Sequence, residues 1–317
     1  MLCRFLQNKK LFIKVALFWF CIVHLSLCAD VFNHIKPCDG KEEGAHSFGS
    51  IDCVYLINLD HRSEKLEHSL EQCGAYNIYP YRFSAINGHE LSLEQLQDIG
   101  LQRKRGIESC HFETLECTYY IKQGKEDKAV DSFVGDPAVA TYFCRNMKKG
   151  AIGVALSHLS ILQDAYDSGY QIIWVMEDDI VIHQHPDLIL QEIENLNRIY
   201  SIEGWDILFT DPDSITPQGE RLQFLGVSQR PNKPMVYYNP VSREPVSEGV
   251  TTIRYRFGAY SMVITRAGIK KILDFYKNND IFYPYDIDIN LFEPNIKMFS
   301  FDFDVVTSLV GAQSDNY

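Results

Sequence analysis

The sequence predicts an α/β fold, a mostly parallel sheet flanked by helices, on two observations. Short apolar runs rich in β-branched and aromatic residues alternate along the chain with segments whose apolar residues recur at helical spacing. The first of these units, residues 51–83, has the order strand, helix, strand. That order implies two parallel strands joined by a right-handed crossover, the basic unit of a parallel sheet.

Size and composition are those of a globular protein. The chain has 317 residues, of which 46% are hydrophobic and 13% aromatic, enough for one large domain or two small ones. Its formal net charge of -12 argues against a nucleic-acid partner, because such a partner requires basic patches that neutralise phosphates. A nucleotide bound through a metal ion remains compatible with this charge.

Residues 1–29 are predicted to be a signal peptide or a membrane anchor. Basic residues at positions 4, 9, 10 and 14 precede an apolar stretch at 15–27, the pattern of a secretory signal. The stretch is short for a bilayer span, so an uncleaved anchor would have to begin near Leu11. A buried N-terminal helix is the other alternative. We expect the protein to be exported or membrane-associated, in a bacterial envelope or a secretory pathway.

Six of the nine cysteines lie beyond residue 29. In an exported protein such thiols can form disulfides, and Cys110, Cys117 and Cys144 fall in one segment. The sequence contains no C-x-x-C pair, which argues against a structural zinc site.

The first half of the mature region is expected to begin with a strand at residues 51–59. A helix follows, with Ser63 as its expected N-cap and Gly74 as its expected C′ glycine, and then a strand at 79–83. A short helix is expected over residues 91–99. The segment 102–149 is mixed and polar and gives no clear pattern.

The second half is more regular. A helix is expected from Gly150 to Gly169, followed by a buried strand at 171–176 and another at 205–210. The stretch 216–254 is rich in proline and polar residues, so we expect loop there. A strand at 259–264 leads to Thr265, the expected cap of a helix that runs through Phe275, and a last strand is expected at 297–301.

The acidic run Glu177-Asp178-Asp179 follows the strand at 171–176. Open α/β sheets bind their ligands at the carboxyl ends of their strands. Adjacent carboxylates repel each other unless a cation or a proton relieves them. Mg²⁺ and Mn²⁺ prefer oxygen ligands and usually share them with substrate phosphates. The run therefore indicates a metal–diphosphate site, and the alternative is a solvated acidic turn.

Four segments in this order resemble glycosyltransferase family 25, which includes lipooligosaccharide galactosyltransferases and procollagen galactosyltransferase domains. They are residues 54–62 (Val-Tyr-Leu-Ile-Asn-Leu-Asp-His-Arg, continued by Glu64-Lys65), 84–88 (Ser-Ala-Ile-Asn-Gly), 150–159 with its Gly-x-x-Gly and Ser-His, and 258–268 with 285–288 (Tyr-Asp-Ile-Asp). On this resemblance, residues 50–317 form a family 25-like catalytic domain.

The resemblance implies a GT-A-like, Rossmann-type fold and a metal-dependent, inverting transfer of a hexose. The expected donor is UDP-galactose, and the expected acceptor is a glycan such as lipooligosaccharide or a glycosylated protein. Glu177, Asp178 and Asp179 are expected to hold Mn²⁺ or Mg²⁺ against the diphosphate. The expected donor-binding residues are Asn58, Arg62, Asn87, Ser157, His158 and Asp178.

Asp286 and Asp288 are the candidates for the general base that removes the proton of the acceptor hydroxyl. The alternative is an ordinary solvated acidic loop. Arg62 has the alternative of a structural ion pair with Glu64 or Asp60. His158 has the alternative of a buried residue that packs its helix against the sheet. Asp211 and Asp213 mark a second acidic strand end, which ranks lower as part of the donor site.

Two other functions remain open at this point. Ala151 and Val154 stand where the family often has Glu and Cys, and the segment 90–149 is longer than usual. These departures suit a degenerate protein that binds a sugar nucleotide or glycan without turnover. A metal-dependent phosphohydrolase could use the same carboxylates.

Overall fold

The structure is a computed structural model that describes residues 31–103, 115–212, 230–231, 243–254, 256–290 and 296–309. The predicted signal or anchor at 1–29, Cys110 and Asp213 lie outside these residues.

A mixed sheet forms the centre of the molecule. In the described part of the chain it has eight strands in the order β10-β11-β13-β9-β12-β7-β1-β2. The strands are β1 (Cys53–Asn58), β2 (Tyr81–Ser84), β7 (Ile172–Glu177), β9 (Ile207–Phe209), β10 (Pro245–Ser247), β11 (Val250–Ile253), β12 (Ser261–Thr265) and β13 (Met298–Phe301). Strands β2, β1 and β7 are parallel, whereas β12 is antiparallel to both β7 and β9. The predicted α/β class is confirmed.

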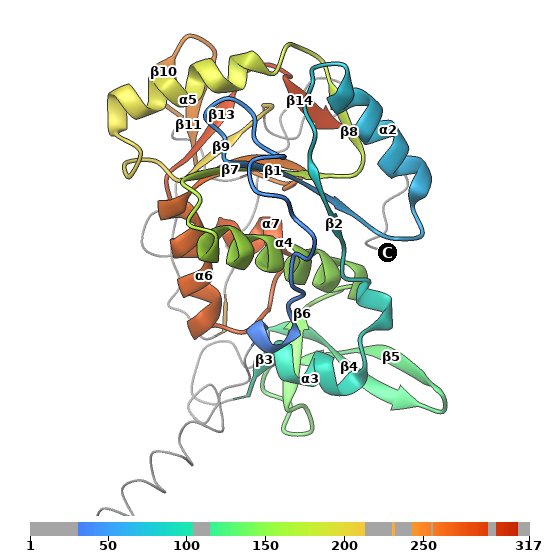
Figure 1. Cartoon of the computed structure of the whole chain (residues 1–317). Helices are drawn as coiled ribbons and strands as arrows, with labels where there is room; N and C mark the ends of the chain where they lie inside the picture. The colour runs from blue at the N-terminus through green and yellow to red at the C-terminus, as the bar shows by residue number, and fades with distance from the viewer. Residues whose placement is uncertain are drawn as a thin grey trace, which may run out of the picture.

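Helices cover both faces of this sheet (Figure 1). Helices α4 (Lys149–Asp167) and α6 (Arg266–Asn278) lie on one face, and α2 (Ser63–Gly74) and α5 (Asp187–Tyr200) on the other. Successive strand residues point to opposite faces, so Tyr55 packs in the α4 layer and Val54 in the α2 and α5 layer. All six residues of β1 are buried, which explains why the strand reads as a continuous apolar run.

The predicted cap of α6 is confirmed, and the predicted caps of α2 are wrong. Thr265 caps α6 by accepting a hydrogen bond from the backbone N–H of Gly268 at 3.2 Å, as predicted. Ser63 is the first helical residue of α2, with Arg62 in the cap position, so its predicted role as N-cap is wrong. Gly74 is not a left-handed C′ residue either. Gly74 is the last helical residue and Ala75 is the C-cap, and the left-handed residue is Asn77, with φ of 57°.

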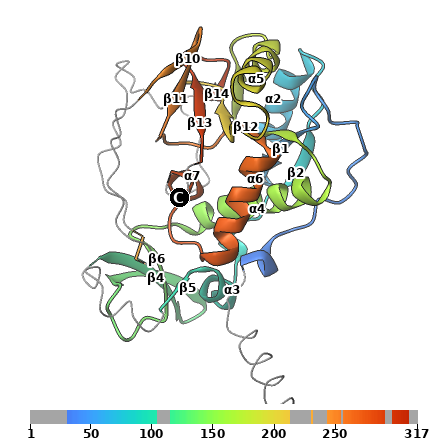
Figure 2. The ribbon, with the colours of Figure 1, turned by 90° about the vertical axis from the view of Figure 1, so that its left-hand side faces the viewer.

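A second, four-stranded sheet lies in the segment that gave no clear pattern. Its strands are β3 (Leu101–Gln102), β6 (Thr141–Cys144), β4 (Glu116–Gln123) and β5 (Glu126–Phe133), in that spatial order. It lies beside α3 (Leu93–Ile99), at the far side of α4 from the main sheet (Figures 1 and 2). Strand β5 has no fully buried residue, and this exposure explains why its sequence lacks an apolar signal.

The remaining elements are short. They are η1 (Val31–His34), η2 (Gly88–Glu90), α7 (Tyr285–Ile289), and β8 (Ile180–Ile182), which pairs with β14 (Val306–Ser308). The expectation of loop over 216–254 is wrong at its end, where β10 and β11 form an antiparallel pair. The residues between 212 and 243, apart from 230–231, lie outside the described part.

The five cysteines that the structure describes are free thiols, and Cys117 and Cys144 lie opposite each other on β4 and β6. Within the described ranges, no helix combines the length and the hydrophobicity needed to cross a bilayer.

Candidate functional site

The site lies at the edge of the main sheet where β1 and β7 end. These neighbouring strands are parallel, with Ile57 in register with Glu177, so Asn58 and the acidic run reach the same edge. Strand β12 is antiparallel, and its beginning therefore lies beside the end of β7. The backbone N–H of Glu177 donates to the carbonyl oxygen of Tyr260 at 2.8 Å.

A pocket that is open to solvent occupies this edge. Its walls are the end of β1, the turn at residues 85–88, the first turns of α4, the acidic run and Lys65. The predicted site residues that line it are Asn87, Ser157, Glu177, Asp178 and Asp179. The cavity is therefore bounded by three of the four segments that carry the family resemblance.

Two glycines bring α4 into backbone contact with the turn at 85–88. A Cβ atom on Gly88 would lie 1.7 Å from the carbonyl oxygen of Lys149, and one on Gly153 would lie 2.4 Å from the carbonyl oxygen of Ile86. Ser157 joins the same contact: its hydroxyl accepts from the N–H of Ile86 at 2.9 Å and donates to the carbonyl of Gly153 at 2.8 Å. This close approach gives a physical reason for Gly153 and Ser157 in the 150–159 segment.

Asn58 fixes the orientation of Asp178. Its Nδ2 donates to Asp178 Oδ2 at 2.8 Å and to the carbonyl oxygen of Arg62 at 2.9 Å. Its Oδ1 accepts from Arg82 Nε at 2.9 Å. Asn58 is 1% exposed, so the amide is committed to protein partners. Its predicted contact with the nucleotide stays a prediction. Asn87 likewise uses its side chain locally, where it caps η2.

Asp179 is the carboxylate of the acidic run with an unsatisfied buried oxygen. Its Oδ1 is buried and has no hydrogen-bond partner in the structure. Burial, with the charge of Glu177 as the next cause, raises the pKa of Asp179 to about 6. Lys65 acts in the opposite direction, with its Nζ 3.7 Å from Asp178 Oδ1 and 3.9 Å from Asp179 Oδ2.

These carboxylates fit a hard divalent cation that takes part of its shell from the substrate. Among the described residues, no group of three or more His, Cys, Asp or Glu side chains converges as a complete metal site. Mg²⁺ and Mn²⁺ are commonly held by one or two carboxylates together with phosphate oxygens and water. Asp179 and its neighbours can supply that partial set.

His158 links the acidic run to α7. It is fully buried, and its ring stacks on Tyr285 with centroids 4.3 Å apart and planes 15° apart. Its Nε2 lies 3.4 Å from Glu177 Oε1. His158 is thus a packing residue that also contacts Glu177. Arg62 forms the alternative ion pair, with its Nη1 donating to Glu64 Oε1 at 3.1 Å.

Asp286 and Asp288 lie in different environments. Asp286 is half-buried, and its Oδ2 accepts from the N–H of Gly258 at 2.9 Å. Burial raises the pKa of Asp286, the Gly258 hydrogen bond opposes this, and the charge of Glu177 adds to the rise. Asp288 is fully buried, with Tyr276 and Arg230 as its partners at 3.2 and 3.4 Å. We therefore keep Asp286 as the base candidate and assign Asp288 to the core.

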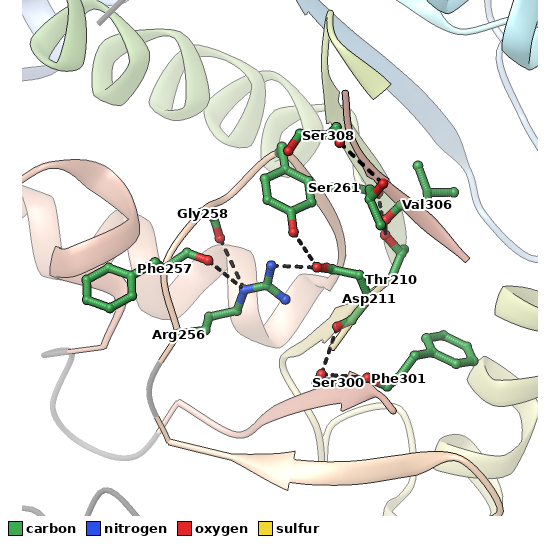
Figure 3. Close-up of polar contacts among 12 residues, drawn as sticks. Thr210, Asp211, Arg256, Phe257, Gly258, Ser261, Ser300, Phe301, Val306 and Ser308 are labelled. Atoms are coloured by element: carbon green, nitrogen blue, oxygen red, sulfur yellow. Dashed lines mark hydrogen bonds and ion pairs between the residues drawn. The ribbon is translucent and has the colours of Figure 1, made fainter. Parts of the chain in front are cut away.

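A buried ion pair between Asp211 and Arg256 lies at the end of β9. Asp211 Oδ1 accepts from Arg256 Nη2 at 3.0 Å (Figure 3). The hydroxyl of Tyr260 donates to the other oxygen of Asp211. The Arg256 guanidinium also stacks over the ring of Phe209, 4.0 Å from its centroid. Asp211 is committed to these partners, which fits its lower rank as a donor-site residue.

Sequence reasoning missed Lys65, Arg256 and Tyr260. Lys65 had a usable signal in the sequence. It lies three residues after Arg62, the cap residue of a helix that begins at the sheet edge, and residues three apart lie on the same face of a helix. Arg256 had none, because its partner Asp211 is 45 residues away in the sequence.

Comparison with known proteins identifies the class to which this fold and site belong. A family model described as "Glycosyltransferase family 25 (LPS biosynthesis protein)" matches residues 51–289, more than half of the chain. The chain therefore belongs to glycosyltransferase family 25.

Curated relatives match over shorter stretches. A "Glycosyltransferase 25 family member" of Aedes aegypti is 25% identical over 157 residues, which are 49% of this chain and 20% of that protein. "Procollagen galactosyltransferase 1" of Danio rerio is 24% identical over 162 residues, 50% of this chain and 21% of that protein. The matched region thus spans about a fifth of these longer relatives.

Proposed function

We propose that this protein is a glycosyltransferase that moves a hexose, galactose from UDP-galactose, onto a hydroxyl of a glycan or a glycosylated protein. Lipooligosaccharide is the glycan that fits the family description. The proposal includes dependence on Mn²⁺ or Mg²⁺ and inversion at the anomeric carbon. The observation that carries it is the pocket at the sheet edge, whose lining includes Asp179 with its buried and unpartnered Oδ1.

The donor would bind along the cavity with its diphosphate near Asp179. A divalent cation bound there supplies Lewis-acid assistance to the departing diphosphate. Asp178 keeps its orientation through Asn58, and Lys65 supplies a nearby positive charge. The backbone contact between α4 and the turn at 85–88 forms another part of the pocket wall.

The acceptor hydroxyl would be activated by Asp286. A direct displacement needs one base and no protein nucleophile, and a positioned carboxylate accelerates such a step by about 10²–10⁴-fold. The hydrogen bond from Gly258 orients the Asp286 carboxylate. His158 and Tyr285 hold α7 against the acidic run, which keeps base and donor together.

Mass spectrometry of the products tests this function. The purified chain is incubated with a set of nucleotide sugars and with glycan and glycopeptide acceptors, with Mn²⁺ or with excess chelator. We expect UDP release and a hexose mass added to an acceptor only with a UDP-hexose and the metal ion. UDP binding without any transfer would favour the degenerate binding protein. Phosphate released from simple esters, independent of any acceptor, would favour the phosphohydrolase.

We also propose export or membrane association through residues 1–29, as the basic and apolar pattern there supports. A chain lacking these residues should lose its association with the membrane fraction, and unchanged fractionation would contradict this.

A further inference from the structure

Lys65 lies between two of the carboxylates of the acidic run. Its Nζ is nearly equidistant from them, 3.7 Å from Asp178 Oδ1 and 3.9 Å from Asp179 Oδ2. Its side chain is only 14% exposed and lines the cavity. An ammonium group in this place offsets part of the repulsion among adjacent carboxylates.

Hydrogen bonds hold helix α2 beside the acidic run, and they therefore set the position of the Lys65 backbone. Ser69 donates to the carbonyl oxygen of Asp178 at 2.8 Å, and Gln72 accepts from the backbone N–H of Ile182 at 3.1 Å. Residues four apart lie on the same face of a helix. The anchored Ser69 therefore places Lys65, one turn earlier, over the carboxylates.

The ammonium and a divalent cation would compete for the same carboxylate oxygens. Both distances exceed the range of a direct hydrogen bond between charged groups, about 2.7–2.9 Å, so the ammonium lies between the two carboxylates at ion-pair distance from each. A flexible four-carbon side chain with three donors can turn from these oxygens to a phosphate in the same cavity.

We propose that Lys65 is a donor-binding residue with two alternating partners. Without donor it is the counter-charge of Asp178 and Asp179, and with donor its ammonium binds the diphosphate oxygens. This inference rests on the proposed function, because it assigns the diphosphate of the same donor to the cavity. It predicts that removal of the lysine raises the affinity for Mn²⁺ and lowers the affinity for UDP. Loss of a residue needed only for folding would not change these two affinities in opposite directions.

The test is the substitution Lys65→Met, with binding of Mn²⁺ alone and of UDP in saturating Mn²⁺ measured by calorimetry. Removing the competing charge should tighten Mn²⁺ binding by about fivefold. Removing a charge-assisted contact to phosphate should weaken UDP binding by about tenfold or more. Lys65→Arg should restore much of the UDP affinity, because it keeps the charge.

Lys270→Met serves as the matched control, since Lys270 pairs with Asp274 on the exposed face of α6, and it should leave both affinities unchanged. Weaker Mn²⁺ binding in Lys65→Met, or unchanged UDP binding, overturns the proposal. The proposed function fails separately. If the wild-type protein does not bind UDP in Mn²⁺, the donor assignment is wrong, while tighter Mn²⁺ binding in Lys65→Met would still support the counter-charge role.

Discussion

At the scale of single residues, position along the chain is a poor guide to chemical role. Asp286 and Asp288 are two residues apart on α7, yet one is half-buried near Glu177 and the other is fully buried against Arg230. The sequence could show that both carboxylates follow an aromatic pair, but not which of them is fully buried. That choice depends on Arg230, whose contact with Asp288 joins residues 58 positions apart.

Asp286→Asn should lower kcat by about 10²–10⁴-fold, because it removes the base, and should leave UDP binding intact. Since burial raises the pKa of Asp286 and a base acts when deprotonated, wild-type activity should fall as the pH drops through a value above the ordinary range of aspartate. A pH–rate profile of both proteins checks this. An unchanged kcat in the variant would rule out Asp286 as the base.

Asp288→Ala should instead destabilise the fold by about 3–5 kcal/mol, because it leaves Arg230 charged and buried without its carboxylate. Chemical denaturation measures the free energy of unfolding, with Asp286→Asn as the matched comparison, which keeps an oxygen acceptor for the Gly258 N–H. A stable Asp288→Ala protein with lost activity would return Asp288 to the list of base candidates.

At the scale of elements, the strands that border the site were readable because each is buried, whereas the short helix α7, which carries Asp286, was not predicted. β1, β7 and β12 are buried nearly throughout, and their apolar runs were recognised. Strand β5 was not recognised, because most of its side chains face solvent. Its pairing with β4 also depends on a two-residue turn that begins at Gly124, with φ of 67°. Local pattern predicts an element only where one face is packed.

The contact between α4 and the turn at 85–88 gives a prediction at this scale. Gly153→Ala should destabilise the protein by about 1–3 kcal/mol, since the new Cβ would press on the backbone of Ile86 and Gly88, and it should weaken UDP binding. Thermal and denaturant unfolding measure the change. Gly74→Ala is the control: nothing lies within 4 Å of the added Cβ, so a stability change near zero or slightly favourable is expected. Equal changes in the free energy of unfolding for Gly153→Ala and Gly74→Ala would contradict the proposed role of the contact between α4 and the turn at 85–88.

At the scale of the whole molecule, the α/β class followed from the alternation of elements, but the strand directions did not. The antiparallel β12 lies between β7 and β9, and no local pattern distinguishes it from a parallel strand, because both are buried on two faces. The antiparallel direction of β12 matters for the site. It brings Gly258 and Tyr260, at the beginning of β12, to the edge where β7 ends.

The acidic run was predicted to be a site from its place after a buried strand, and the structure adds its neighbours. Lys65, Asn58 and the start of α4 converge on it from distant segments. Such convergence depends on tertiary packing, so the sequence could indicate the site's centre but not its walls.

The central claim is that the acidic edge holds the diphosphate of a UDP-sugar through a divalent cation. Calorimetric titration of UDP into the wild-type protein and into Asp179→Asn, each with Mn²⁺ and with chelator, tests it most directly. We predict that UDP binds the wild-type protein only with Mn²⁺ and that Asp179→Asn, with its fold intact, loses this binding. UDP affinity that is the same without Mn²⁺, or the same in Asp179→Asn, would contradict the claim.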